Sequence, residues 1–588
     1  RRFSVRRWYF TGRISPVIAA DRPANLLKPL HPQGWDDVSY HGSDQIQTPN
    51  LDALALQGIR LQQYYSEAIC TPARSALLTG KYPMRIGMHG LPLYNGEDRG
   101  IPLTERLLPS YMKALGYSTH LVGKWHVGMS REEFLPTARG YDTHYGMRGG
   151  FVDYYTYQKV EEWPNGRLLF GLDLFDNDIP QENEARYAID ALTDRAVHLI
   201  RSHNQSQPLF LHVAHNAPHA GNDGSALQPP PDRVVSNNHI ANSDRRLYGR
   251  IISRLDESMG QIVKALAEMD ILKDTIIIFQ SDNGAPTTGQ YANWGINLPF
   301  RGKKYTPWEG GVRVPAFMWH SSFQPQVWHG LMHITDWMPT LIAAAGGTIS
   351  ANIDGVNQWD SIVQNTDSKR REVLIAIESE IGYAAYRAGD FKVIVGNLST
   401  VPNGFYGAEF LVNRAKTPDY FTALKNCDTT KELENLGAYF DRHEVQSMRR
   451  DSAVRQTDPV RDTTLCIPST TKGCLFNVRR DPTESHDLWY RANKIANLLT
   501  ARLRSLWAQQ WRRPPTKLDD ASDPANYNYI WLPWIYNNDE YTNDYDYQLS
   551  KAFEEQITNN TETNDNAADI DCDGSRKLSI SCWDKSLF

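Results

Sequence analysis

The stretch "DTIIIFQSDNG", residues 274–284, places four large apolar residues in a row before a polar end. A short apolar run of this kind, bounded by turn-forming residues, predicts a buried β-strand. "YSTHLVGKW" (117–125) and "PLFLHVAHN" (208–216) have the same form. Since each run ends in charged or amide side chains, the sequence predicts several buried strands whose polar ends could line one site.

Helical patterns separate these strands. In "RYAIDALTDRAVHLIRSH" (186–203) and "YGRIISRLDESMGQIVKALAEM" (248–269), apolar residues recur at every third or fourth position. Alternating strands and helices predict an α/β fold, with a large mixed, mainly parallel sheet sandwiched by helices. In such sheets, ligands bind beyond the carboxyl ends of the strands.

Changes in composition and in apolar periodicity divide the chain into four parts. Residues 1–33 are atypical, 34–385 form the α/β domain, 386–518 predict a smaller C-terminal α+β domain, and 519–588 form an Asn-, Asp- and Tyr-rich tail. "AYRAGDFKVIVGN" and "LFNVRRDPTESHDL" predict strands of the smaller domain, and "NKIANLLTARLRSLWAQQW" predicts its helix. The weak periodicity of the tail predicts loops or partial disorder.

The composition is that of a globular protein large enough to bury more than one core. The chain has 588 residues, of which 41% are hydrophobic and 22% charged, with a net charge of −6. This charge gives no indication of nucleic acid or an anionic membrane as a partner. No run reaches the roughly 20 apolar residues of a transmembrane helix. The basic N-terminal segment also lacks the apolar core of a signal peptide.

Cys70 lies in "ICTPARSALLTG" (69–80), directly before a helix-like segment. Thr71 is suited to the N-cap, and Gly80 to the end of the helix. A group at a helix N-terminus is favoured in its anionic form, and Arg74 lies one turn further on. Taken alone, Cys70 could be a buried thiol or half of a disulfide. At this position it also suits a reactive nucleophile or another group that binds an oxyanion.

Other side chains suited to an anion site follow predicted strands or lie in the loops beyond them: Lys124, His126, His219, Lys303 and Lys304. Lys124 and His126 are two residues apart, so they share one face of an extended segment. Asp282 and Asn283 supply oxygen ligands suited to a hard cation such as Ca²⁺. Taken singly, each lysine could instead be a solvated surface side chain, each histidine a hydrogen-bonded core residue, and Asp282 and Asn283 part of a turn. Together they predict an anion site with metal ligands and acid/base groups.

These motifs resemble the type I sulfatase family. "CTPARSALLTG" is similar to its signature C-x-P-[S/A]-R, and further motifs match in order and spacing: "GWDDVSYHG", "TPNLDALALQGI", "VGKWHVG", "SDNG", "RGKKYTPWEGGVRVPAFMW" and "HITDWMPTLIAAAGG". The match covers about residues 34–392 and is closest to the arylsulfatase B group, the N-acetylgalactosamine-4-sulfatases. The resemblance implies an alkaline phosphatase-like fold and a sulfuric ester hydrolase.

The resemblance also implies the roles of the site residues. Cys70 would be converted to formylglycine (3-oxoalanine) by the formylglycine-generating enzyme, giving a hydrated aldehyde whose hydroxyl attacks sulfur. His126 would assist this step, and His219 or Lys304 would protonate the leaving alcohol. Sulfate binding is the implied role of Lys124, His219 and Lys304, and charge neutralisation that of Arg74 and one Ca²⁺ ion. The implied ligands of this ion are modified Cys70, Asp282 and Asn283.

One part of the family pattern is absent. Relatives precede "GW" with a strand ending in two aspartates that bind calcium, whereas this chain has His31, Pro32 and Gln33 there. Pro29 and Pro32 predict that no central strand precedes Gly34. Three explanations are open: an incorrect N-terminal gene model, a degenerate sulfatase that binds calcium poorly, or replacement of the ligands by the two aspartates that follow Trp35.

The sequence therefore predicts a sulfatase acting on an aryl sulfate or a sulfated, glycosaminoglycan-like sugar. The alternatives are a sulfated-glycan-binding pseudoenzyme and a phosphodiesterase or phosphonate hydrolase of the same superfamily. The family implies a lysosomal or secreted protein. Two features suit that route: sequons at Asn204, Asn397 and Asn559, and five cysteines in the C-terminal third that could form disulfides, Cys427, Cys466, Cys474, Cys572 and Cys582.

Overall fold

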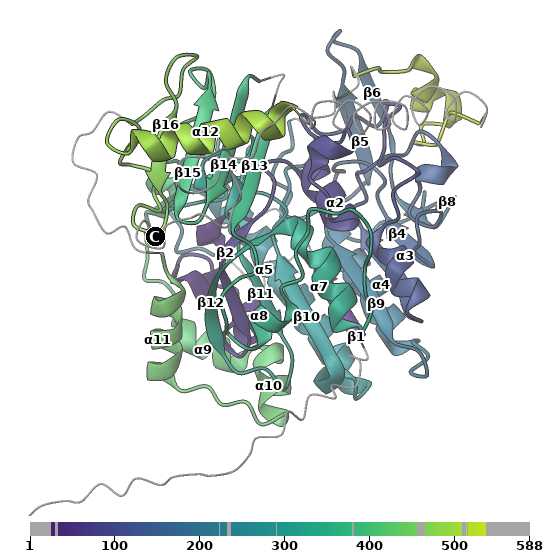
Figure 1. Ribbon diagram of the computed structural model, residues 1–588. Coiled ribbons are helices and arrows are strands. Elements are labelled where there is room, and N and C mark those ends of the chain that lie inside the picture. The colour runs from purple at the N-terminus through teal and green to yellow at the C-terminus, as the bar shows by residue number, and fades with distance from the viewer. Residues whose placement is uncertain are drawn as a thin grey trace, which may run out of the picture.

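A ten-stranded sheet runs through the centre of the molecule (Figure 1). The computed structural model describes residues 25–29, 33–222, 224–231, 237–289, 291–378, 381–454, 465–508, 513 and 516–536. In spatial order the strands are β12 (Gln326–His333), β2 (Ile59–Tyr65), β11 (Ala316–Trp319), β10 (Thr275–Gln280), β1 (Asn25–Pro29), β9 (Leu209–Ala214), β3 (Ser118–Gly123), β4 (Thr143–Gly146), β7 (Phe175–Asp176) and β8 (Ile179–Pro180). The strands from β10 to β4 are parallel, β12 is parallel to β2, and the other pairs are antiparallel.

Helices cover both faces of this sheet, which confirms the predicted α/β class. Alternate residues of β10 point to opposite sides, so that Ile277 and Phe279 join one hydrophobic core while Ile276 and Ile278 join another. The first core is covered by α1 (Pro49–Leu56), α4 (Ala188–Arg201) and α5 (Ser243–Glu268). The second is covered by α2 (Cys70–Thr79), α3 (Leu108–Ala114), α7 (Trp337–Ala344) and α8 (Trp359–Val363).

Strand β1 corrects the prediction that no central strand precedes Gly34. It lies between β9 and β10, and Leu26 is buried in the second core. Its ladder with β10 spans only Asn25–Leu27, whereas Pro29 is paired with β9 alone. Because Pro29 is the last residue of the strand, its missing N–H removes little of the ladder.

A second, four-stranded antiparallel sheet lies beside the large one. Its strands are β13 (Glu372–Glu378), β14 (Tyr383–Ala388), β15 (Phe391–Gly396) and β16 (Cys474–Asn477), and α12 (Asn493–Ala508) packs on it. Figure 1 shows α12 crossing this sheet at the upper left. The strands and the helix predicted beyond residue 385 are thus present.

Three helices between β15 and β16 return to the large sheet. They are α9 (Tyr420–Asn426), α10 (Asp428–Asn435) and α11 (Arg442–Ser452), and buried side chains of all three join the core of α1 and α5. The division of the chain at residue 385 stays a prediction. Residues 1–24 and 537–588, which include most of the predicted tail, lie outside the described residues.

A disulfide joins Cys466 to Cys474 at the start of β16, as expected for a cysteine pair in the C-terminal third. Cys427 keeps a free thiol that contacts Thr430, while Cys572 and Cys582 lie outside the described residues. Among the helices that the structure describes, none combines the length and the apolar character needed to cross a membrane.

Candidate active site

Cys70 is the first residue of α2 and is 3% exposed. Its Sγ lies 3.4 Å from Nδ1 of His126. Gly80 ends the helix in the left-handed region (φ 67°), as predicted. The predicted N-cap is wrong, because Ile69 takes that position and Thr71 lies inside the helix, where its hydroxyl donates to the carbonyl oxygen of His126 at 3.2 Å. Residue 70 thus starts the helix and faces a histidine.

The contacts of His126 fix which of its ring nitrogens carries the proton. Nε2 lies 3.0 Å from the carbonyl oxygen of Leu93, which can only accept, so Nε2 is the donor. Burial, followed by the positive charges of Lys124 and Lys159, lowers the pKa of His126 well below its usual value. The neutral ring therefore presents its Nδ1 lone pair to Cys70.

Arg74 joins α2 to the ends of two strands. Its guanidinium forms a buried ion pair with Oδ2 of Asp282, which follows β10, at 3.0 Å. It also donates to the carbonyl oxygen of Lys124, which follows β3, at 2.9 Å. One arginine thereby holds together the ends of β3, β10 and the beginning of α2.

His219 and Lys304 form a second buried contact in the site. Nζ of Lys304 lies 3.3 Å from Nε2 of His219, whose Nδ1 donates to the carbonyl oxygen of Ala220 at 2.8 Å. The ring of Phe151 stacks on His219, with 5.3 Å between centroids and 8° between planes. An ammonium donor thus faces a neutral imidazole whose orientation is fixed on two sides.

The electrostatics of the site favour an anion. Burial raises the pKa of the Cys70 thiol, but Lys124, Lys304 and Arg74 outweigh it and the net shift is downward. Burial lowers the pKa of Lys124 to about 8. Burial also lowers the pKa of Lys304, yet the negative charges of Cys70, Tyr305 and Asp282 raise it overall, so Lys304 is charged. These cations surround residue 70 in a desolvated setting, where each charge acts strongly.

Two buried oxygens beside this cluster fit a cation. Oδ1 of Asp282 and Oδ1 of Asn283 have no hydrogen-bond partner in the part of the chain that the structure describes. His31 and Pro32 lie outside that part, and Gln33 is buried with its N–H donating to Ser281 Oγ at 2.8 Å. No three His, Cys, Asp or Glu side chains gather as a metal site within the described ranges. The donors present are therefore few for Ca²⁺.

The aspartates that follow Trp35 have other partners. Asp37 is fully buried and accepts from Arg245 at 2.6 Å and from the hydroxyl of Tyr248 at 2.7 Å. Burial raises the pKa of Asp36 to about 7. Asp37 thus ties the loop after β1 to α5, and its oxygens are already engaged.

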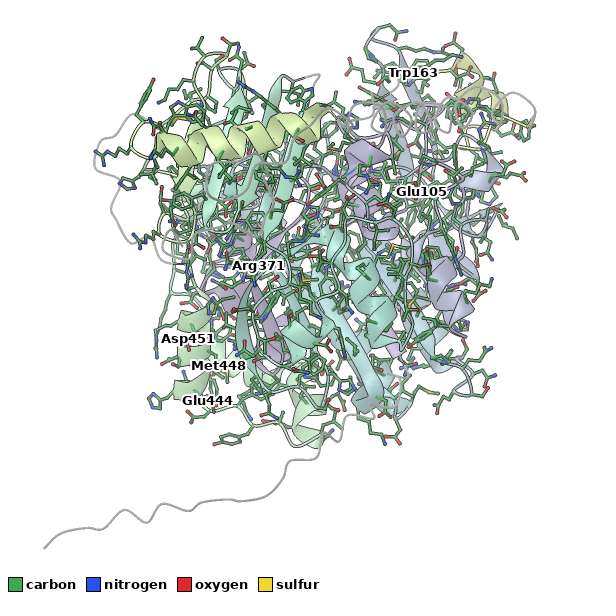
Figure 2. The ribbon with its side chains drawn as sticks, viewed as in Figure 1. Glu105, Trp163, Arg371, Glu444, Met448 and Asp451 are labelled. Atoms are coloured by element: carbon green, nitrogen blue, oxygen red, sulfur yellow. A yellow bond between two sulfur atoms is a disulfide. The ribbon has the colours of Figure 1, made fainter. Side chains whose placement is uncertain are left out.

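The site opens into a cleft of about 820 Å³. Its walls include residues that the sequence reasoning missed: Phe151, Lys159, Glu161, Trp163, Tyr291 and Tyr305. Lys159 and Glu161 lie on β5 (Gln158–Glu162), which pairs with β6 (Leu168–Leu172) in a hairpin near Trp163, labelled in Figure 2. The sequence "QKVEE" contains a single apolar residue, so it shows no alternating pattern that would predict a strand here.

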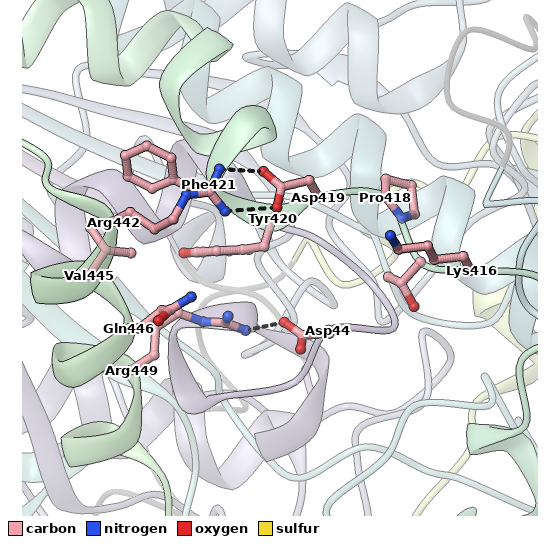
Figure 3. A pocket seen from close by; sticks show the side chains of 11 residues that line it. Asp44, Lys416, Pro418, Asp419, Tyr420, Phe421, Arg442, Val445, Gln446 and Arg449 are labelled. Carbon is pink, nitrogen blue, oxygen red and sulfur yellow. Dashed lines mark hydrogen bonds and ion pairs between the residues drawn. The ribbon is translucent and has the colours of Figure 1, made fainter.

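A second pocket lies away from this cleft, between α9, α11 and Asp44 (Figure 3). Arg442 forms a two-bond pair with Asp419 at 2.9 and 3.0 Å, and Arg449 pairs with Asp44 at 2.7 Å. Because each guanidinium already has a carboxylate, this pocket attracts an anion less than the cleft does.

A buried cluster of cations and imidazoles at the strand ends of an α/β sheet suits a hydrolase of oxyanion esters. The chain belongs to the sulfatase family, whose members are sulfuric ester hydrolases: the family model described as "Sulfatase" matches residues 32–347. Arylsulfatase J of Mus musculus is 34% identical over 511 residues, 85% of this chain and 78% of that protein.

A second relative and a solved structure are also similar to this chain. N-acetylgalactosamine-6-sulfatase of Homo sapiens is 32% identical over 361 residues, 59% of this chain and 67% of that protein. The crystal structure of the PsFucS1 sulfatase from Pseudoalteromonas sp. shares the fold, with a TM-score of 0.58 at 24% identity over 84% of this chain and 92% of that one.

Proposed function

We propose that the protein hydrolyses the sulfate ester of a sulfated, glycosaminoglycan-like sugar through a formylglycine made from Cys70. The observation that carries this proposal is the position of residue 70. It begins a helix inside the cleft, 3.4 Å from a neutral imidazole nitrogen. Once oxidised to formylglycine, residue 70 would supply a hydrated aldehyde as nucleophile.

The other site residues would bind the sulfate and move protons. Lys124, Arg74 and Lys304 place positive charge around residue 70, which stabilises charge that develops on the sulfate oxygens. His126 would accept a proton at Nδ1. Lys304 would donate to the leaving alcohol, since it is the charged member of its pair with His219.

A calcium ion would add positive charge at the same place. Asp282 and Asn283 would hold it through their unpartnered oxygens, together with residue 70. Asp282 also neutralises Arg74, so one carboxylate serves both cations. The ion would polarise the sulfate and assist its binding.

One relative and several features of this chain support a substrate class and a location. One similar protein is named an N-acetylgalactosamine-6-sulfatase, and the cleft has the aromatic walls that suit a sugar. Asn204 and Asn397 of the sequons are exposed, and a disulfide is present. We propose a lysosomal or secreted protein that meets the formylglycine-generating enzyme on that route.

Mass spectrometry of the Cys70 peptide tests the proposal. Protein made in a cell that contains the formylglycine-generating enzyme should show replacement of sulfur by oxygen and loss of two hydrogens. The same protein should hydrolyse an aryl sulfate, and Cys70→Ala should not. An unmodified thiol contradicts the formylglycine proposal. Faster turnover of a bis-aryl phosphate would assign the protein to phosphodiester hydrolysis instead.

A catalytically impaired glycan-binding protein is the second candidate. It is favoured by the metal donors, because Asp282 is the single carboxylate among the proposed ligands and it already pairs with Arg74. Calcium titration monitored by calorimetry distinguishes the two candidate functions. The impaired protein would bind Ca²⁺ only at millimolar concentration or above, as expected for a site with few charged ligands, and would bind sulfated oligosaccharide without turnover.

A further inference from the structure

The hairpin of β5 and β6 has one face that continues outward from the cleft. In its register Val160 is paired with Phe170 and Glu162 with Leu168. Paired residues of an antiparallel ladder point to the same face, so these four side chains form one surface. Val160 and Glu162 also line the cleft. The surface therefore leads from the cleft to Phe170.

Phe170 is unusually exposed for an aromatic residue in a strand. Its side chain is 46% exposed, and Tyr529, 51% exposed, stacks against it with 4.9 Å between ring centroids and 15° between planes. We call this pair the aromatic platform. Two nearly parallel, stacked rings each cover one face of the other, so the pair offers a ligand the uncovered face of a ring that its neighbour holds in place.

The backbone around Tyr529 fixes the platform in place. The N–H of Leu172 donates to the carbonyl oxygen of Tyr529 at 2.8 Å, and the N–H of Trp531 donates back to Leu172 at 3.0 Å. Asn528 and Tyr529 both have positive φ values, 53° and 60°, which non-glycine residues adopt only when their surroundings hold them. Trp531 is fully buried. Tyr529 is thus held rigidly while its ring faces solvent.

The charges around the platform limit what it can bind. Glu162 and Gln158 are exposed on the same face, and Arg167 nearby is neutralised by Asp520 and Asp523. The surroundings are therefore acidic, with the exposed apolar side chain of Leu168 on the same face. A neutral sugar fits them, because its C–H face stacks on an aromatic ring while its hydroxyls bond to the carboxylate and the amide. A uronate at this position would be repelled by Glu162.

We propose that the aromatic platform binds a neutral sugar of an oligosaccharide whose sulfated residue lies at Cys70. The occupant is carbohydrate, since the platform is continuous with the cleft through Val160 and Glu162. This inference rests on the proposed function and deepens it: the protein acts on chains longer than a disaccharide, and among glycosaminoglycan-like chains it prefers those with a neutral sugar at the platform to those with a uronate there.

Calorimetry in a Cys70→Ala background tests this without turnover. The probes are a hexasaccharide and a disaccharide of sulfated galactan, and a hexasaccharide of chondroitin sulfate, in which alternate sugars carry a carboxylate. Phe170→Ala and Tyr529→Ala should each weaken binding of the galactan hexasaccharide about fivefold to tenfold. Binding of the galactan disaccharide should not change, and the chondroitin hexasaccharide should bind no better than a disaccharide.

Matched variants keep the result interpretable. Phe170→Trp and Tyr529→Trp should retain hexasaccharide binding, because they preserve a flat ring. Tyr490→Ala removes an aromatic side chain that is 75% exposed elsewhere and should have no effect. The melting temperature should stay the same in every variant, since both platform rings are half exposed.

Several outcomes overturn the inference. They are equal losses for both galactan probes, no loss for the hexasaccharide, preferential binding of the chondroitin hexasaccharide, or a protein dimer that the platform variants dissociate. If the disaccharide binds and aryl sulfate is hydrolysed while the platform variants behave like the parent, this inference alone fails. If aryl sulfate is not hydrolysed and residue 70 stays a thiol, the proposed function fails.

Discussion

Lys303 and Lys304 are neighbours in sequence, yet the structure gives them different surroundings. Lys304 is 2% exposed and contacts His219, whereas Lys303 bonds to the hydroxyl of Thr288 at 3.1 Å on the wall of the cleft. We therefore expect Lys304→Met to lower kcat/KM for an aryl sulfate by about 100-fold or more, because it removes a desolvated charge beside residue 70. Steady-state kinetics measure this.

Lys303→Met is the matched control for this prediction. It makes the same substitution at the neighbouring position of the same loop but leaves the contact between Lys304 and His219 intact, so kcat/KM should change little. Equal losses in the two variants would show that the loop needs positive charge in general and that Lys304 has no specific role.

The sequence predicted which residues gather at one edge of the sheet because they share a position in the fold. Cys70, Lys124, His219 and Asp282 each follow a predicted strand or begin a helix, and such positions meet at one edge of a parallel sheet. What the sequence did not show was their pairing. The Lys304–His219 contact and the Arg74–Asp282 ion pair join distant segments, and only the packed sheet brings them within 3.3 and 3.0 Å.

At the scale of the element, β1 shows most clearly that pairing with neighbouring strands can form a strand that the local sequence does not predict. Its five residues contain a lysine and end in a proline, so its local pattern does not predict a strand. The neighbours β9 and β10 supply the ladder that makes it one, and Asn25 adds a side-chain bond, accepting from the N–H of Leu209 at 3.0 Å. Tertiary pairing here overrides local propensity.

Leu26→Ala tests the importance of β1. Leu26 is 1% exposed in the second core, so the truncation should lower the free energy of unfolding by about 2–5 kcal/mol. Thermal unfolding should show a clear fall in melting temperature. Ile179→Ala, at a 68% exposed site on β8, should leave the melting temperature nearly unchanged. A Leu26 variant as stable as the parent would show that β1 contributes little to the core.

At the scale of the whole molecule, a buried charge network connects the small sheet to the loop that carries Lys304. Lys392 on β15 pairs with Glu309 at 3.0 Å and with Glu484 at 2.8 Å, and all three side chains are fully buried. Glu309 begins α6 (Glu309–Val312), a few residues after Lys304, and its N–H donates to Glu484 at 2.7 Å. The network therefore anchors the loop that carries Lys304.

This network should make stability depend on pH. Burial and the neighbouring charge of Glu309 raise the pKa of Glu484 to about 7, although Lys392 opposes the shift. Between its usual pKa of 4.5 and 7, the folded protein then binds more protons at Glu484 than the unfolded chain does. The contribution of Glu484 to the stability of the folded protein is fully present below pH 4.5 and is lost as the pH rises through 7.

Glu484→Gln should remove this contribution. We expect the melting temperature of the variant to fall less between pH 5 and 7 than that of the parent, by about 2 °C or more. The pH dependence of the parent's melting temperature also includes contributions from buried histidines such as His215. Burial lowers the pKa of His215 to about 3, so its contribution to stability increases as the pH rises, opposite to that of Glu484. The difference between the two curves isolates Glu484.

Glu182→Gln is the control, because Glu182 is exposed, and its curve should overlay that of the parent. A Glu484 variant whose melting temperature changes with pH exactly as in the parent would show that Glu484 titrates near its usual pKa. Glu309 does not interfere in this range, because Lys392, Arg313 and Arg387 lower its pKa against burial and its own effect lies below pH 4.5.

The sequence by itself determined the α/β class, the buried strands, the helices between them and the residues at their ends. These features depend on local patterns of apolar and polar residues, which can be seen within short windows. The family motifs from Gly34 to Lys392 added the chemistry expected of Cys70.

Only the tertiary structure decided the rest. It placed β1 at the centre of the sheet, packed α9–α11 against a core of the large sheet, and put Tyr529 against Phe170 on β6. Each of these depends on contacts between segments far apart in the chain. Such contacts are determined by which surfaces can be buried together, and no local pattern records them.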